Sequence, residues 1–266
     1  MSILSNPDVH ILKLHFHFSL NLKAEPFSLT PSHVFYRLSS HQGISRGLGI
    51  MNVLIIILGI ILLFGLLYYE NKKDKIPLLM TKSALSLLFV MTAVLQPHSV
   101  PVYYHYLLVG LIFCLVGDVC LAFPQKNAFM GGLVAFLAGH VFYVISFISL
   151  ISILHWISTE MFIIFVVSAL IFFWLRPHLK SMLIPVLLYI LVITVMASGA
   201  WAVFWKSSFL ISGRVLILVG SFCFYFSDVF VARNKFVEEE YRNRLLGLPL
   251  YYTGQFMLAF STGLLK

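Results

Sequence analysis

Residues 109–123, VGLIFCLVGDVCLAF, decide the fold, because Asp118 is the one charged residue in a run that is otherwise almost wholly apolar. Residues 219–232, VGSFCFYFSDVFVA, repeat this pattern around Asp228. With their apolar flanks, both runs reach the roughly 20 residues that a helix needs to cross a bilayer. The apolar residues are continuous rather than alternating, which indicates membrane-spanning helices and not the strands of a barrel.

The same criterion finds eight apolar segments and predicts an all-α fold, a polytopic membrane helix bundle of about eight transmembrane helices. Composition agrees with this prediction. Hydrophobic residues make up 60% of the chain and charged residues only 11%, whereas soluble domains carry roughly 25% charged residues. The predicted segments are residues 50–69, 76–96, 102–123, 129–154, 157–175, 181–205, 211–232 and 245–265.

The net charge of +8 indicates membrane topology rather than nucleic-acid binding, because the basic residues lie in short links between the segments. The links after the second and fourth segments hold no Lys or Arg. We therefore expect the links after the first, third, fifth and seventh segments, which hold most of the basic residues, to lie in the cytoplasm. Their basic residues are Lys72, Lys73, Lys75, Lys126, Arg176, Lys180, Arg233, Lys235, Arg242 and Arg244.

Residues 1–50 differ from the predicted transmembrane domain of residues 51–266, and we expect them to form a poorly ordered extension. Met51 lies at the beginning of the first segment. This suggests the hypothesis that translation of the native protein starts there, which N-terminal sequencing tests. The five histidines of the extension are irregularly spaced and lack a cysteine or acidic partner, so we predict no metal site there. The three cysteines contain no CxxC pair, and we predict no cofactor. The histidines are His10, His15, His17, His33 and His41.

The sequence suggests a parallel internal repeat of four helices plus four. Gly110 and Asp118 align without gaps with Gly220 and Asp228. An even number of helices separates the copies, so they would run in the same direction about an axis along the membrane normal. The repeat would place both aspartates at one depth. A proline one helix upstream also recurs, at Pro77 and Pro185.

Asp118 and Asp228 are the only acidic residues deep inside the predicted segments. A charge at membrane depth costs at least ~2.5–3.5 kcal/mol, so such residues tend to mark function. Polar residues of other segments cluster at the same depth, near the predicted cytoplasmic ends. We therefore expect a pocket that opens toward the cytoplasmic leaflet. Its expected members are the catalytic residues Asp118, Asp228 and His140, and the substrate-binding residues Lys82, Tyr189, Ser227, Tyr252 and Gln255.

Most of these residues also have a plainer interpretation. The aspartates could be packing groups bonded across the bundle, and His140 could be a buried histidine. Lys82 could extend to the membrane surface, and Tyr189 and Tyr252 could belong to an interfacial aromatic belt. The spans contain no GxSxG, HExxH or paired histidine ligands, which argues against a serine lipase or a metalloprotease.

The ordered set of motifs resembles the YhhN-type membrane proteins, the lysoplasmalogenases, over residues 51–266. The resemblance implies a hydrolase that cleaves the vinyl ether bond of lysoplasmalogens, giving a fatty aldehyde and a glycerophospho-ethanolamine or -choline. It implies a lysophospholipid and membrane lipids as partners, and no nucleic acid. The matching residues are Gly117-Asp118, Phe136 with His140 and Tyr143, Pro185 with Tyr189, Ser227-Asp228, and Tyr252 with Gln255.

This reaction is consistent with two carboxylates. Vinyl ether hydrolysis begins with protonation of the carbon beta to the oxygen, and water then adds to the oxocarbenium ion. In a dry site one carboxyl group would hold the proton while the other is ionised, much as in glycosidases. The alternative function is a proton-coupled transporter with Asp118 and Asp228 as protonation sites. The sequence alone does not specify which aspartate is the acid, the preferred head group or the oligomeric state.

Overall fold

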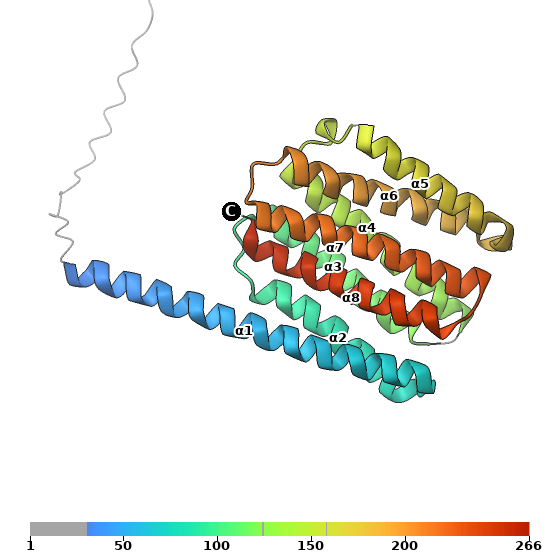
Figure 1. Ribbon diagram of the computed structural model, residues 1–266, viewed down its shortest axis with the longest axis horizontal. Helices are drawn as coiled ribbons and strands as arrows, with labels where there is room; N and C mark the ends of the chain where they lie inside the picture. The colour runs from blue at the N-terminus through green and yellow to red at the C-terminus, as the bar shows by residue number, and fades with distance from the viewer. Residues whose placement is uncertain (1–30, 124, 158, 266) are drawn as a thin grey trace, which may run out of the picture. The chain divides into compact units, whose positions relative to one another are not determined.

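The described chain consists of α-helices joined by short links, as Figure 1 shows for a computed structural model. The backbone is described for residues 31–123, 125–157 and 159–265, and the side chains from residue 47 onward, except those of Lys126 and Lys206. Residues Gly47–Lys266 form one unit, separate from Met1–Arg46. The helices are α1 (Pro31–Lys72), α2 (Lys75–Leu95), α3 (Pro101–Leu121), α4 (Lys126–Leu150), α5 (Thr159–Leu175), α6 (Leu183–Lys206), α7 (Ile211–Ala232) and α8 (Tyr241–Leu264), with the π-helical turn η4 (Arg233–Val237) before α8.

Seven of the described helices are long and apolar enough to cross a membrane. With α8 the bundle has eight helices, which confirms the predicted helical membrane fold. α8 is not among the seven, although it has 24 residues. Its polar side chains are buried against α2, α3 and α7 instead of facing lipid, so α8 does not need a uniformly apolar surface. These buried side chains include Asn243, Gln255, Ser261 and Thr262.

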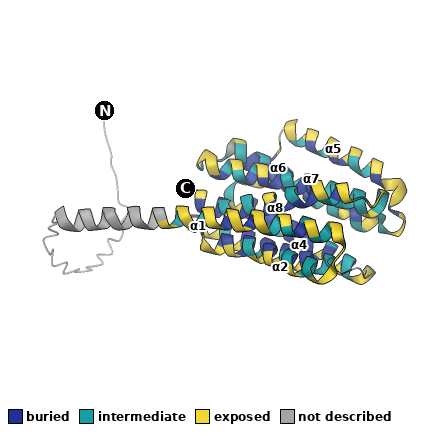
Figure 2. Cartoon of the chain, turned by 60° about the horizontal axis from the view of Figure 1, so that its bottom comes forward, coloured by how far each residue is buried: buried dark blue, intermediate teal, exposed yellow. Residues whose placement is uncertain are grey.

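Exposed residues line the outward faces of several helices (Figure 2), and many of them have large apolar side chains. On α1, Leu54 and Phe64 are 61% and 69% exposed, and on α5 Phe162 is 70% exposed. A contiguous surface of this kind is unfavourable in water but is accommodated by lipid chains. The exposed faces therefore agree with a bundle surrounded by a bilayer.

Two pairs of glycines allow close helix crossings at corresponding places. A Cβ atom added to Gly139 of α4 would lie 3.1 Å from the carbonyl oxygen of Gly110 on α3. A Cβ atom added to Gly254 of α8 would lie 2.7 Å from the carbonyl oxygen of Gly220 on α7. Only glycine permits backbones to approach this closely. Gly110 and Gly220 are aligned in the predicted repeat, so the α3–α4 and α7–α8 crossings follow the pattern that the repeat implies.

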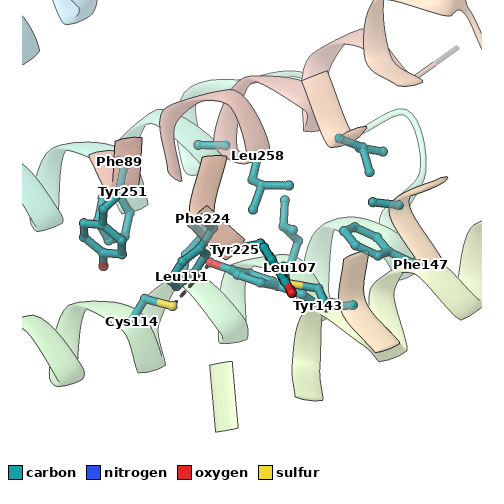
Figure 3. Packing of buried hydrophobic residues seen from close by; sticks show 14 of the residues in the cluster. Phe89, Leu107, Leu111, Cys114, Tyr143, Phe147, Phe224, Tyr225, Tyr251 and Leu258 are labelled. Atoms are coloured by element: carbon teal, nitrogen blue, oxygen red, sulfur yellow. Dashed lines mark hydrogen bonds between the residues drawn. The ribbon is translucent and has the colours of Figure 1, made fainter. Parts of the chain in front are cut away.

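Apolar and aromatic side chains pack together in the core of the bundle (Figure 3). Leu107 and Leu111 of α3, Phe147 of α4 and Leu258 of α8 are all completely buried and belong to one core cluster. Close packing of this kind leaves little room for a polar passage. Buried polar groups, such as the Tyr103 and Ser261 hydroxyls 2.6 Å apart, lie within the same packed core.

Several helix ends differ from the predicted segments. α1 begins at Pro31 rather than residue 50, and α4 runs from Lys126 to Leu150 rather than from 129 to 154. Hydropathy marks the part of a helix that crosses lipid, whereas the helix itself continues through polar residues until a turn ends it. The predicted disorder of residues 1–50 stays a prediction, because residues 1–30 lie outside the described chain.

Candidate active site

Asp118 and Asp228 approach one cavity from two helices that end on the same side of the bundle. Asp118 lies in the last turn of α3, and Asp228 lies just over one turn before the end of α7. Both side chains line a cavity of about 40 Å³, which we call the carboxylate cavity. Its other polar residues are Lys82, Ser227, Asn243, Arg244 and Tyr251.

Asp118 is surrounded by groups that favour its ionised form. The Nζ atom of Lys82 lies 3.3 Å from Oδ1 of Asp118. The hydroxyl groups of Ser86 and Tyr251 each donate a hydrogen bond of 2.6 Å to Oδ2. The aspartate is only 2% exposed. One cation and two hydrogen-bond donors therefore compensate the burial of a carboxylate anion at this position.

Asp228 has a different environment, with fewer groups that stabilise a negative charge. The Tyr189 hydroxyl donates a hydrogen bond of 2.6 Å to Oδ2 of Asp228. In the described chain, no lysine or arginine pairs with this carboxyl group; its ionisable neighbour is His140, whose Nε2 lies 3.7 Å from Oδ2. The Asp228 side chain is 17% exposed. It is thus the more accessible carboxyl group and the one better suited to carry a proton.

The orientation of His140 directs one ring nitrogen at Asp228. The Nδ1 atom lies 2.7 Å from the carbonyl oxygen of Phe136, which can only accept a hydrogen bond, so Nδ1 carries a proton. Nε2 is buried and has no hydrogen-bond partner among the described residues. In a neutral imidazole this nitrogen is a proton acceptor. Nε2 therefore faces Asp228 as a free proton acceptor, at 3.7 Å, which is beyond hydrogen-bond distance.

The two aspartates are equivalent in the predicted repeat but not in their partners. Asp118 on α3 receives a hydrogen bond from Tyr251 of α8. Asp228 on α7 is approached by His140 from α4 instead. Each aspartate is thus supported by a helix of the opposite copy. The contacts differ because Lys82 on α2 supplies a cation to Asp118, whereas Tyr189 on α6 supplies a neutral hydroxyl to Asp228.

The carboxylate cavity adjoins two further cavities. An apolar cavity of about 70 Å³ lies among α4, α5, α6 and α7 and shares Asp228 and Phe136 with the carboxylate cavity. An outer cavity of about 390 Å³, formed around η4, shares Arg244 with it. The apolar cavity is lined mainly by aliphatic and aromatic side chains, whereas the outer cavity combines such side chains with the charged residues Lys235, Glu238, Glu239 and Arg244. The carboxyl groups therefore lie where apolar and polar surroundings meet.

Comparison with known proteins identifies the family of the chain. The model of the YhhN family matches residues 78–262. The chain belongs to the YhhN family. No curated protein matches it, and neither does any solved structure. All eight residues predicted from the sequence to form the site fall within the part that matches the YhhN family.

The structure brings most of these predicted residues of the YhhN chain together. Lys82, Asp118, Ser227 and Asp228 line the carboxylate cavity, Tyr189 lines the apolar cavity, and His140 reaches Asp228. Tyr252 and Gln255 line neither cavity. Tyr252 lies behind Ser86, 3.3 Å from its hydroxyl, and Gln255 accepts a hydrogen bond of 2.7 Å from Tyr143. These two residues support the site from within the core.

Four polar residues of the site were missed from the sequence, namely Ser86, Asn243, Arg244 and Tyr251. Ser86 lies four residues after Lys82 and so shares its helix face, a spacing that could have revealed it. Tyr251 precedes the predicted Tyr252, and the sequence alone does not decide which of the two faces the site. In the sequence, Arg244 was assigned only to the basic residues that determine membrane topology. No group of three or more His, Cys, Asp or Glu that could hold a metal ion occurs in the described part of the chain.

Proposed function

We propose that this YhhN-family protein is an intramembrane hydrolase that cleaves the vinyl ether bond of lysoplasmalogens. The observation that carries the proposal is the position of Asp228. Its carboxyl group lies in both the apolar cavity and the carboxylate cavity, with His140 beside it. A single-chain ether lipid has the same order of parts, because its vinyl ether bond joins an apolar chain to a polar head.

The cavities suggest how such a lipid would be held. The first carbons of the alkenyl chain would occupy the apolar cavity among Leu133, Val186 and Ile190. The vinyl ether would lie beside Asp228, and the glycerol would lie in the carboxylate cavity. The head group would extend into the outer cavity beside η4. The lipid would enter sideways from the leaflet.

In the proposed reaction, Asp228 acts first as the acid. Its proton moves to the carbon beta to the ether oxygen, and the alkene electron pair forms the new C–H bond. The resulting oxocarbenium ion is stabilised by the newly formed Asp228 carboxylate. Water adds to the oxocarbenium carbon and loses a proton to Asp228, directly or through Nε2 of His140. The hemiacetal then collapses: Asp228 gives its proton to the departing glycerol oxygen and takes up the hydroxyl proton, directly or through His140, so that aldehyde is released and Asp228 is protonated again.

Asp118 plays a different part in this proposal. The carboxylate pairs with Lys82 and accepts two hydrogen bonds, which fix its position. Since it also lines the carboxylate cavity, it can orient the attacking water and add negative potential near the oxocarbenium ion. The structure thus supports a division of labour, with Asp228 as acid and base and Asp118 as the permanent anion.

Proton-coupled transport would need a path that continues across the bundle. The packed core formed around Leu107, Phe147 and Leu258 leaves little room for such a path, which favours the hydrolase. The distribution of Lys and Arg favours a cytoplasmic position for the site, so we propose that the enzyme takes its substrate from the cytoplasmic leaflet.

The test is aldehyde release by the purified protein in detergent from 1-alkenyl lysophosphoethanolamine and lysophosphocholine. Activity is expected to fall by at least about 100-fold relative to the parent protein in Asp228→Asn and in Asp118→Asn, each assayed at a temperature at which the variant is shown to be folded. A well-folded parent protein that releases no aldehyde from either lipid would refute the hydrolase. Proton-driven uptake of a lysolipid into liposomes would then be measured instead.

A further inference from the structure

Arg244 lies at the junction between the carboxylate cavity and the outer cavity and lines both of them. It is in the first turns of α8, and its side chain is 32% exposed. Asp228 and Asp118 line the carboxylate cavity together with it. A group bound to Arg244 would therefore lie beside the cavity that holds the glycerol next to the proposed reacting bond.

Only one edge of the Arg244 guanidinium group has a partner. Its Nε atom lies 3.1 Å from Oε1 of Glu70, near the end of α1. Within the described residues, no hydrogen bond or ion pair involves the two terminal nitrogens of Arg244. The Tyr241 hydroxyl also donates to the carbonyl oxygen of Leu67, which joins the start of α8 to α1 a second time. Arg244 is thus held in place while its terminal donors stay available.

The other cations of this region are already engaged. Lys82 pairs with Asp118. Arg233 bonds with Glu238, Glu240 and Asn243. The Nζ atom of Lys235 lies 4.5 Å from the centre of the Phe129 ring. Arg244 is therefore the cation best placed to meet an anionic ligand that reaches both cavities.

We propose that Arg244 binds the phosphate of a glycerophospholipid head group, and that Glu70 is the positioning residue that aims it. A guanidinium group offers two parallel donors that match two phosphate oxygens. In a lysoplasmalogen the three glycerol carbons separate the vinyl ether from the phosphate. In the protein, Asp228 and Arg244 line the same carboxylate cavity, and of the two only Arg244 also lines the outer cavity. The assignment to this substrate rests on the proposed function, but phosphate binding can be measured without catalysis.

The experiment compares two ligands in nanodiscs: a non-hydrolysable 1-O-alkyl lysophospholipid and a 1-O-alkylglycerol, which lacks the phosphate. Arg244→Gln is expected to weaken binding of the phospholipid by roughly 10- to 100-fold and to leave binding of the alkylglycerol unchanged. Glu70→Gln is expected to give a smaller loss with the same selectivity. Arg242→Gln is the matched control, because Arg242 is exposed on the same helix and lines none of the three cavities.

Three results would decide the matter. Equal loss of both ligands in Arg244→Gln and in the milder Arg244→Lys, or loss of neither, would overturn the phosphate site. Selective loss of the phospholipid would support it, and the retained alkylglycerol binding would show that the variant is folded. Selective loss in a protein that releases no aldehyde would support the phosphate site while removing the proposed hydrolysis.

Discussion

The Nε2 atom of His140 lies 3.7 Å from Oδ2 of Asp228 and has no hydrogen-bond partner within the described chain. The opposite nitrogen of the ring is fixed by the Phe136 carbonyl oxygen. A completely buried imidazole with one free nitrogen is unusual, because buried polar atoms are normally hydrogen-bonded. The arrangement is explained if Nε2 of His140 is kept free to accept a proton from the attacking water in the proposed reaction.

The first prediction concerns His140→Gln. Glutamine can still occupy the core, but it cannot carry the proton between Asp228 and water, so kcat should fall by about 100-fold with little change in KM. Steady-state aldehyde release measures both quantities. The control is His105→Gln, at an exposed position at the other end of α3. A higher KM with unchanged kcat would instead assign His140 a role in binding.

The second prediction concerns the buried pair of Lys82 and Asp118. Removing one partner of such a pair leaves an unpaired buried charge and typically costs about 3–5 kcal/mol of unfolding free energy. Lys82→Met and Asp118→Asn should each destabilise the protein, and the double variant should lose clearly less than the sum of the two. The unfolding free energy can be measured by SDS titration. Additive losses would mean that the two side chains do not interact.

Much of the fold could be predicted from apolar runs, because lipid permits only uninterrupted spans. The two aspartates could be found for the same reason, since charges at membrane depth are rare. α8 was predicted as a span, yet by hydropathy it falls short of the other seven helices. Its buried polar residues, such as Gln255, lower its hydropathy because protein rather than lipid surrounds them.

The roles of individual polar residues could not be predicted in this way. Tyr251 and Tyr252 are adjacent, but only Tyr251 reaches Asp118, because neighbouring residues of a helix point about 100° apart. Lys82 was expected to meet the substrate, whereas the structure pairs it with Asp118. Arg244 belongs to a link rich in basic residues, and only its contact with Glu70 and its place between two cavities distinguish it.

The third prediction concerns Gly117→Ala. A Cβ atom at this position would lie 2.7 Å from the ring of Phe136, which separates the apolar cavity from the carboxylate cavity. We expect a loss of about 1–3 kcal/mol in unfolding free energy and reduced activity, because the ring must move. Gly131→Ala is the control, since its Cβ atom would meet only the Cys120 sulfur at 3.8 Å. Similar stability of both variants would contradict this packing argument.

The fourth prediction concerns the apolar cavity. Val186 is buried and lines it, so Val186→Phe would displace part of a bound alkenyl chain. Loss of contact with two methylene groups, at about 0.8 kcal/mol each, should lower kcat/KM for an 18-carbon substrate by about tenfold. Val134→Phe, at a 57% exposed position on α4, should leave kcat/KM unchanged. If both variants keep the parent kcat/KM, the chain binds elsewhere.

The fifth prediction concerns the side of the membrane that the site faces. Glu239 is exposed and lines the outer cavity, and Ser99 is exposed in the link between α2 and α3. The distribution of Lys and Arg predicts that Glu239 lies in the cytoplasm and Ser99 outside. In a protein whose native cysteines are replaced by serine, a membrane-impermeant maleimide should label Ser99→Cys in intact cells and Glu239→Cys only after permeabilisation. The reverse labelling pattern would invert the topology, and the enzyme would then take its substrate from the opposite leaflet.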